Sequence, residues 1–349
     1  MKKRFGWLLS REAALGSALV FLALLGGFFA LCYGSWQIDF ASVVRVLMSK
    51  TGLAEGGVEP VESVIVWDGR LPRYLVAFSV GFSLAVAGAI MQGIFKNPMA
   101  EPGVIGISAG AALGAVGALY FGLASRSLLA LPLSAIAVSL LTLMTVFLIA
   151  TMRGHTSVAT LLLTGIALNM IFGALTSFII AMSTREFDVG RVIVTWLMGD
   201  LNNRSWEHVQ IVLPTTALAV AGTLCFVKDL NILMIGEETA ANLGVNIPLA
   251  RNSLLFLSSV MTGGAIAVAG VIGFVGLVAP HIVRALIGPD NRKLVPIAGL
   301  MGAVFVIYAD LFVRLVVKVD LKVGVLTSML GGPFFLFLIV RHRRRFEYL

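Results

Sequence analysis

Few side chains in this sequence have the chemistry expected of an active site, and His281 and Arg284 are the first to consider. They lie three residues apart in the apolar stretch GFVGLVAPHIVRALIGPD (273–290), so on a helix kinked by Pro280 they would share one face. Ionisable residues inside membranes are often functional, and a histidine there can relay protons. The alternative is an interfacial histidine beside an arginine whose charge reaches water. The sequence favours this second interpretation.

A serine motif offers the other route to catalysis. GISAG (106–110) matches the G-x-S-x-G pattern of serine hydrolases, which is meaningful between a strand and a helix. Here it lies in a stretch rich in Gly, Ala and Ser, so an intramembrane hydrolase using Ser108 and His281 is only a remote alternative. The sequence has no G-x-x-x-x-G-K-[ST], no H-E-x-x-H and no cysteine cluster. We therefore expect no catalytic residue, no metal site and no cofactor bound by this chain.

The elements around these residues belong in a membrane. Of 349 residues, 58% are hydrophobic and only 13% are charged, and the mean hydropathy is +0.97. These values are typical of a polytopic membrane protein and not of a soluble domain. The formal net charge of +8 comes from basic residues at the ends of apolar runs. That placement indicates membrane-flanking charge, so we expect a lipid environment and no nucleic-acid partner.

Apolar runs of spanning length recur along the whole chain and predict an all-α protein with about ten transmembrane helices. The predicted ranges are 13–33, 74–95, 104–122, 128–151, 158–182, 207–227, 250–268, 271–287, 295–317 and 323–340. No linker or soluble segment divides them, so residues 1–349 are expected to form a single transmembrane domain. The first run is long enough to span and is interpreted as an uncleaved helix. An even number of helices, with MKKR and RHRRR at the two ends, predicts that both termini are cytoplasmic.

Two of the predicted helices are rich in small residues. The stretches at 81–93 and 103–120 consist largely of Gly, Ala and Ser. Small side chains let helix backbones approach closely in a membrane. Both helices are therefore expected to be buried among the others.

The stretch GEETAANLGVN (236–246) is polar, which is unusual in this chain. Glu237 and Glu238 suit the positive end of a short helix, and Gly244 suits its stop. The predicted topology puts this helix in the cytoplasm. An ordered helix in an inner loop is either a solvated connector or a docking site for another chain, and the sequence supports both equally.

Three arginines are predicted at the opposite, outer face. Arg70 and Arg73 precede one span in RLPR, and Arg314 ends another in ADLFVR. Asp310 and Arg314 are four residues apart and could pair on one helix side. Such arginines commonly anchor a helix at the interface. They could also form a cationic rim for an acidic partner.

Seven stretches in order resemble the FecCD/BtuC-type permease family. They are RLPR (70–73), GAIMQGIFKNPMAEPGVIGISAGAALGA (88–115), WLMGDL (196–201), IGEETAANLGV (235–245), GFVGLVAPHIVR (273–284), AD-x-x-x-R (309–314) and VGVLTSMLGGPFF (323–335). No single stretch is strong evidence, but the set is specific and runs from about Arg70 to Arg345. Members of the family are the membrane subunits of ABC importers for iron-siderophores, haem and cobalamin.

The resemblance implies a BtuC-like type II ABC importer permease fold and a set of partners. It implies a multi-pass protein of the cytoplasmic (inner) membrane that works beside a second permease, expected to be identical. Two copies of an ABC ATPase subunit, which use the ATP, would bind at the cytoplasmic face. A substrate-binding protein would dock at the outer face. The chain itself would be non-catalytic.

The resemblance also assigns candidate site residues. Those matching the ATPase-coupling segment are Gly236, Glu237, Glu238, Ala240, Ala241, Leu243 and Gly244. Those matching the docking surface for the binding protein are Arg70, Arg73 and Arg314. Those matching the cytoplasmic gate and pathway are Gln92, Asn97, Pro98 and Met99.

One position departs from the family pattern. The family has Glu-Leu-Pro-Val-Gly before its last helix, whereas this chain reads Asp320-Leu321-Lys322-Val323-Gly324. A lysine in place of proline at the outer face is expected to alter the docking surface or the partner charge that it prefers.

The leading function is thus an importer permease for ferric siderophore, with haem- and cobalamin-type chelates left open. A secondary transporter driven by an ion gradient is the alternative. It would need ionisable residues near the middle of the membrane. Asp310 and His281 fall near opposite ends of their predicted spans instead.

Overall fold

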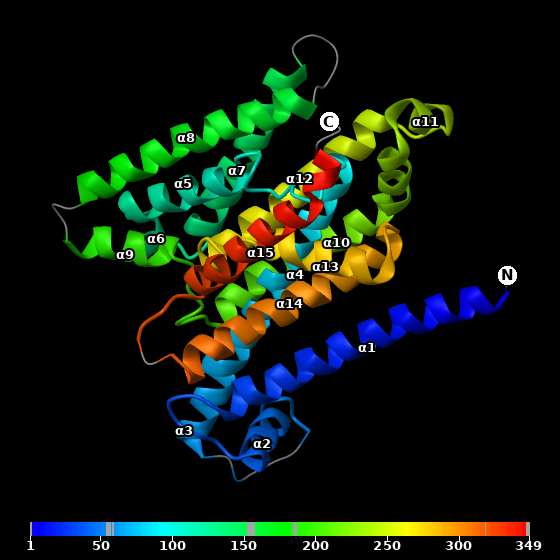
Figure 1. Ribbon diagram of the computed structural model, residues 1–349. Helices are drawn as coiled ribbons and strands as arrows, with labels where there is room; N and C mark the ends of the chain where they lie inside the picture. The colour runs from blue at the N-terminus through cyan, green and yellow to red at the C-terminus, as the bar shows by residue number, and fades with distance from the viewer. Residues whose placement is uncertain are drawn as a thin grey trace.

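The computed structural model describes residues 2–53, 57, 59–151, 158–183, 187–317 and 319–346. Throughout these residues, every regular element is a helix. Ten are apolar, and together they form a bundle (Figure 1): α1 (Lys2–Cys32), α4 (Leu71–Ile94), α5 (Ile107–Tyr120), α7 (Ala130–Thr151), α8 (Val158–Ser183), α10 (Trp206–Ile235), α12 (Ile247–Ala269), α13 (Val275–Ile287), α14 (Asn291–Leu315) and α15 (Val323–Phe346).

These helices confirm the predicted all-α membrane fold. Within the described residues, seven are long and apolar enough to cross a membrane, and α5, α13 and the Val323–Phe337 part of α15 are shorter apolar helices. The predicted ranges 250–268 and 271–287 correspond to α12 and α13, and the sequence leaves almost no loop between them. The division falls at residues 270–274, where Gly270 and Phe274 both have positive φ, of 70° and 66°. Two residues with positive φ in one short segment end the helical hydrogen bonding.

Several shorter helices lie in segments that the sequence analysis left without structure. They are α2 (Phe40–Lys50), α3 (Pro60–Ser63), the π-helix η1 (Val64–Arg70), α6 (Leu123–Arg126) and α9 (Phe187–Leu197). Helix α9 is amphipathic: Ile193 and Trp196, three residues apart, are buried while Val192 and Val194 are exposed. With 11 residues it is too short to register as a span.

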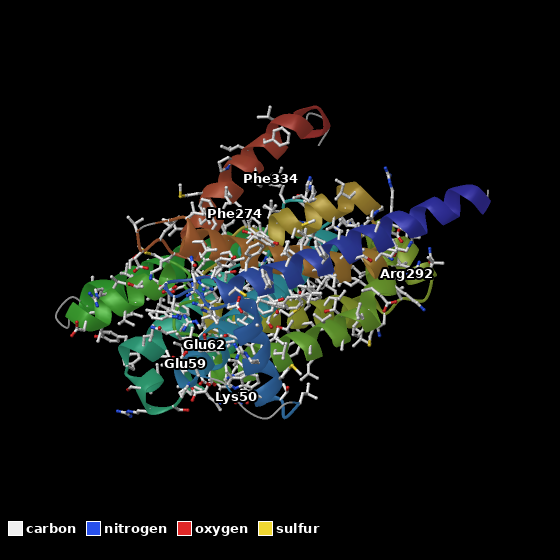
Figure 2. The ribbon with its side chains drawn as sticks, turned by 90° about the horizontal axis from the view of Figure 1, so that it is seen from below. Lys50, Glu59, Glu62, Phe274, Arg292 and Phe334 are labelled. Carbon is white, nitrogen blue, oxygen red and sulfur yellow. The ribbon has the colours of Figure 1, made fainter. Side chains whose placement is uncertain are left out.

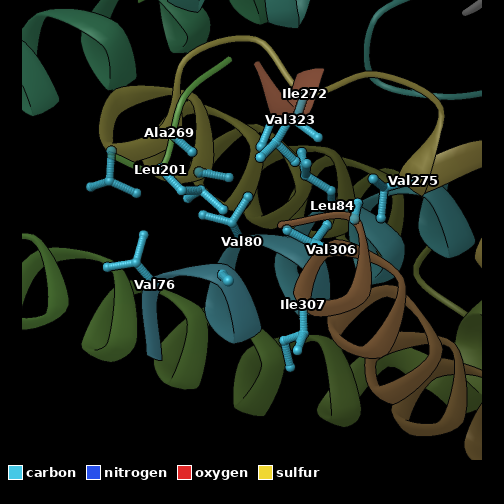
Figure 3. Close-up of a cluster of buried hydrophobic side chains, with 14 of the residues drawn as sticks. Val76, Val80, Leu84, Leu201, Ala269, Ile272, Val275, Val306, Ile307 and Val323 are labelled. Atoms are coloured by element: carbon cyan, nitrogen blue, oxygen red, sulfur yellow. The ribbon is translucent and has the colours of Figure 1, made fainter. Parts of the chain in front are cut away.

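Helix α4 is the centre of the bundle, and α10, α12, α13 and α14 pack around it. The close packing follows from glycines at helix crossings, as the sequence predicted for 81–93. A methyl group on Gly81 would overlap the backbone of Gly302 in α14, and one on Gly88 would overlap Gly276 in α13. Larger side chains complete the core around these crossings (Figure 3), with Val80 and Leu84 of α4 near Val275 and Val306.

Other helices present apolar side chains outward. Helix α8 lies at the edge of the bundle in Figure 1, and only 6% of its apolar stretch is buried inside the protein. Helix α15, which contains the labelled Phe334, stands away from the rest in Figure 2, and the labelled Phe274 lies against it. Exposed side chains on these two helices include Met170, Phe178, Met329 and Leu336. Such surfaces need lipid or another apolar chain against them.

The ends of the bundle are distinct. Helices α2 and α3 and the start of α4 mark one end, which we call the arginine end (Figure 1). Helix α11 (Glu237–Asn242) marks the other, the α11 end, on whose side α1 begins and α15 finishes.

Candidate functional site

The three arginines singled out in the sequence meet at the arginine end. Arg70, Arg73 and Arg314 line one cleft of about 660 Å³, together with Arg204. Residues 34–36, 202–205 and 319–321 also line it, with Ile65, Asp68, Gly69 and Val313. The structure therefore brings together residues that are up to 244 positions apart in the sequence.

Each of these arginines already makes bonds within the chain. Arg73 holds Asp310 through two nitrogens, with Nη2 2.6 Å and Nε 2.9 Å from the carboxylate oxygens, and its Nη1 donates to Asn202 Oδ1 at 2.6 Å. Asp310 is 4% exposed. The predicted Asp310–Arg314 pair is present but long, at 3.9 Å. The first partner of Asp310 is thus Arg73, which comes from another helix.

Arg70 and Arg314 form hydrogen bonds to the end of α1 and to the loop that follows it. Arg70 donates to the carbonyl oxygen of Leu31 at 2.6 Å and to that of Trp36. Arg314 donates to the carbonyl oxygen of Tyr33 at 2.9 Å. Arg70 is only 7% exposed. A charge reversal at Arg70 or Arg73 would therefore disturb the fold as well as any docking surface.

Arg204 is a member of this cleft that the sequence analysis did not select. It follows WLMGDL by three residues, and its Nη2 donates to the carbonyl oxygen of Asp200 at 2.9 Å. Burial lowers the pKa of Arg204, and the nearby Asp200 opposes that shift. Its Nε makes no hydrogen bond within the described residues. Nothing in its local sequence distinguishes it from an ordinary interfacial arginine.

Lys322, the departure from the family pattern, points inward. Its Nζ lies 3.0 Å from Asp200 Oδ2 and 2.8 Å from Asp320 Oδ1, and its side chain is 7% exposed. Burial alone would lower its pKa, but the bonds to Asp320 and Asp200 outweigh burial and raise the pKa. For Asp200, the Asn202 amide and Lys322 outweigh burial in the same way and lower the pKa. Of the three charges, only Asp320, at 76% exposed, is presented to a partner.

The α11 end contains the short polar helix predicted from 236–246. Helix α11 begins at Glu237 and ends at Asn242, and Gly244 follows with φ of +80°. Its Ala240 is fully buried against Leu233 and Ala250. The exposed residues are Glu237, Glu238, Thr239, Ala241, Asn242 and Leu243. Glu237 differs from Glu238, because its carboxylate pairs with Arg251 of α12.

The candidate gate residues follow one another but have different surroundings. Gln92 is buried in α4 and donates to the carbonyl oxygen of Leu277 at 3.2 Å, so it joins α4 to α13. Asn97, Pro98 and Met99 form a turn after α4, in which Asn97 Oδ1 accepts from the Met99 amide at 2.9 Å. Glu101 follows this turn, and burial raises its pKa to about 7.

The two residues of the remote hydrolase alternative have separate surroundings. Ser108 lies on α5 near Glu101 and Gly103. The His281 ring on α13 packs edge-on against Phe334 of α15, with centroids 6.2 Å apart. In the part of the chain that the structure describes, no group of three or more His, Cys, Asp or Glu side chains is placed to hold a metal ion.

Comparison with known proteins decides the class of this bundle. The sequence model of the FecCD transport family matches residues 22–341. The chain belongs to the FecCD transport family. It is an ABC importer permease, and in this family the permease is the non-catalytic, membrane-spanning transport subunit. Such permeases work with an ATPase and a substrate-binding protein.

Several members of the FecCD family are closely similar. The cobalamin import permease BtuC of Halobacterium salinarum is 43% identical over 81% of this chain and 75% of its own length. The hemin permease HmuU of Yersinia pestis is 42% identical over 79% and 83%. The Fe(3+) dicitrate permease FecD of Escherichia coli is 38% identical over 80% and 86%.

A solved structure agrees over nearly the whole FecCD fold. It is described as an inward-facing conformation of a metal-chelate type ABC transporter. It superposes with a TM-score of 0.82 at 30% identity, covering 94% of this chain and 99% of that one.

Proposed function

We propose that this permease moves a ferric siderophore into the cytoplasm, with haem- and cobalamin-type chelates as the other cargo classes. Similar permeases are named for ferric dicitrate, hemin and cobalamin, which supports a bulky metal chelate. Two surfaces at opposite ends of one bundle carry the proposal. One is the cleft lined by four arginines at the arginine end, and the other is the short polar helix α11 at the α11 end.

Helix α11 is the proposed contact for the ATPase. Its residues from Gly236 to Gly244 leave the apolar bundle, and Leu243 is 62% exposed although it is apolar. An exposed leucine and the acidic Glu238, both on a short helix with defined ends, could bind in a groove on a soluble partner. The α11 end would then be cytoplasmic, which agrees with the basic residues at both termini.

The arginine cleft is the proposed dock for the substrate-binding protein. Four arginines line it, against Asp68 and Asp320. An acidic side chain of the partner could pair with these guanidinium groups. The exposed Asp320 would favour a basic group opposite it.

A second copy of this chain is the proposed cover for part of the exposed apolar surface. Helices α8 and α15 present apolar side chains to the outside. The groove between Leu197, Met198, Val271, Val325 and Met329 lies between α9 and the base of α15. A permease pair related by two-fold symmetry would place these faces along a shared pathway.

Mild-detergent purification of the tagged protein from its host tests the proposal, with co-purifying chains identified by mass spectrometry. We expect an ABC ATPase in near-equal amount. A substrate-binding protein should be retained at low salt and released at high salt, because charge pairs at a surface are screened. A stable, transport-active protein without an ATPase would refute the proposal and favour an ion-driven transporter.

A further inference from the structure

The α11 helix is too short to hold its own position. It has six residues, and isolated helices of that length are unstable in water. Its orientation must therefore come from contacts with neighbouring elements. The structure supplies one contact between α11 and α12, and a second contact just before α11, between α10 and the start of α14.

The first contact joins α11 to α12. Glu237, the first residue of α11, pairs with Arg251, whose side chain is 11% exposed, while the Glu237 side chain is 52% exposed. The pair lies beside the small apolar cluster of Leu233, Ala240 and Ala250. Glu237 and its neighbour Glu238 are both exposed, but the Glu237 carboxylate pairs with Arg251 of its own chain.

The second contact joins the last turns of α10, just before α11, to α14. Asn231 Nδ2 donates to Asp290 Oδ1 at 2.6 Å, and Asn231 Oδ1 accepts from the backbone and side-chain nitrogens of Asn291, both at 2.8 Å. Asn291 is fully buried. Asp290 also caps α14 by accepting from the Arg292 amide at 3.1 Å. A side-chain bond network of this kind holds two helix ends in one fixed arrangement.

These contacts lie on a continuous path into the bundle. Helix α14 packs along α4, and α4 ends at the turn that contains Asn97 and Pro98. Figure 1 shows α11 at the far end of α10 and α12, which are its only chain connections to the bundle. A movement of α11 therefore reaches the bundle through these two helices. A flexible connection between α11 and the helices would not transmit that movement.

We propose that Arg251 and Asn231 are positioning residues that transmit the movement of the ATPase from α11 to α14 and α4. Arg251 acts through Glu237, and Asn231 acts through Asp290 and Asn291. Glu238 and Leu243 make the contact with the ATPase. The inference rests on the proposed role of α11 and adds which residues turn that contact into movement.

The test uses the complex purified with its own ATPase and placed in nanodiscs, with a fluorescent maleimide on Cys225 of α10 as reporter. Cys225 is exposed and Cys32 is buried, so the label reaches one site of this chain, and a cysteine-free ATPase keeps it there. ATP should change the fluorescence of the wild-type complex. In Arg251→Gln and in Asn231→Leu, the ATPase should co-purify at the wild-type ratio while the ATP-induced change falls by about threefold or more.

Matched variants separate positioning from general destabilisation. The exchange Glu237→Arg with Arg251→Glu should restore the response to within about twofold of wild type. Lys228→Gln, which removes an exposed charge from the same end of α10, should change nothing. An unchanged response in Arg251→Gln, or no rescue by the exchange, would overturn the inference. So would loss of the ATPase from Arg251→Gln. If the wild-type protein instead purified without an ATPase, the proposed function itself would be refuted.

Discussion

At the scale of the residue, Lys322 shows how burial changes the meaning of a substitution. From the sequence alone, Lys322 was interpreted as an added positive charge on a docking surface. In the structure it is 7% exposed and is shared between two aspartates. It joins the loop after α9 to the start of α15, beside the contact where Gly324 donates to the Gly199 carbonyl oxygen at 3.1 Å. Its role here is to hold two segments together, and it contributes little to the outward charge.

Lys322→Met should therefore lower the stability of the protein by about 1–3 kcal/mol, because it leaves Asp200 half-buried without its cation. Asp320→Asn should cost much less, below about 1 kcal/mol, because Asp320 is exposed and its charge is solvated. Thermal unfolding in detergent micelles measures both. Equal losses in the two variants would contradict this account.

The same ion pairs predict a pH window. The pKa of Asp200 is lowered in the folded state, so its contribution is present above the ordinary aspartate pKa of about 3.9 and is lost as pH falls below it. The pKa of Lys322 is raised, so its contribution is lost only as pH rises past the ordinary lysine value of about 10.4. The stability difference between wild type and Lys322→Met should be constant from about pH 5 to 9 and should shrink below about pH 4.

Glu101 makes the opposite prediction. Burial raises its pKa to about 7, so the folded protein keeps a proton that the unfolded chain releases above about pH 4.3. Stability therefore declines as pH rises from about 4.3 to 7. Glu101→Gln mimics the protonated side chain, so it should melt above wild type at pH 8, and the gap should close toward pH 4.5. A gap that persists at pH 4.5 would contradict the explanation.

At the scale of the element, glycines decide how closely the central helices approach. Helix α4 touches the α13 backbone at Gly88 and the α14 backbone at Gly81. These contacts leave no room for a side chain. Helix α5 also contains glycines, but at Gly117 no atom lies within 4 Å of where a methyl group would be.

Gly88→Ala and Gly117→Ala are thus the same chemical change in two different settings. Gly88→Ala should force α4 and α13 apart and cost about 1–3 kcal/mol. Gly117→Ala should be neutral or stabilising by up to about 1 kcal/mol, because alanine is the better helix former. Thermal unfolding of the two variants in one detergent provides the comparison. Similar melting points would show that the α4–α13 contact is not as close as described.

At the scale of the whole molecule, helices α8 and α15 present apolar surfaces that need lipid or another chain against them. The apolar face of α8 is almost entirely open, and that of α15 is largely open. Lipid can cover the outside of a bundle, but the groove beside Met198 and Met329 lies next to a break in the helices at residues 270–274. Non-helical backbone at membrane depth is stable only when protein or a water-filled path covers it.

We expect two copies of this chain in each assembled complex. Native mass spectrometry of the complex released from nanodiscs should give a mass that contains two permeases of 37.1 kDa and two ATPase subunits. One copy of this chain beside a different permease would replace the identical pair with a mixed one.

The sequence by itself determined the class of fold, because hydrophobicity is a local property. Each of the ten predicted ranges overlaps a helix of the structure. The short α11 helix was predicted for the same reason, since Glu237 and Gly244 are start and stop signals within one segment. Helix α9 escaped prediction because it is short, and its burial depends on neighbours from other parts of the chain.

What only the tertiary structure decided is which side chains meet. Asp310 was predicted to pair with Arg314 four residues away, yet its close partner is Arg73, 237 residues away. Lys322 and Glu237 were assigned to surfaces, yet both pair within the chain. Arg204 was not selected, because its place in the cleft depends on segments from other parts of the chain. Pairing between distant charges depends on how helices cross. The small residues at 81–93 predicted a close helix contact, but no local pattern reports that the partner of Gly88 is Gly276.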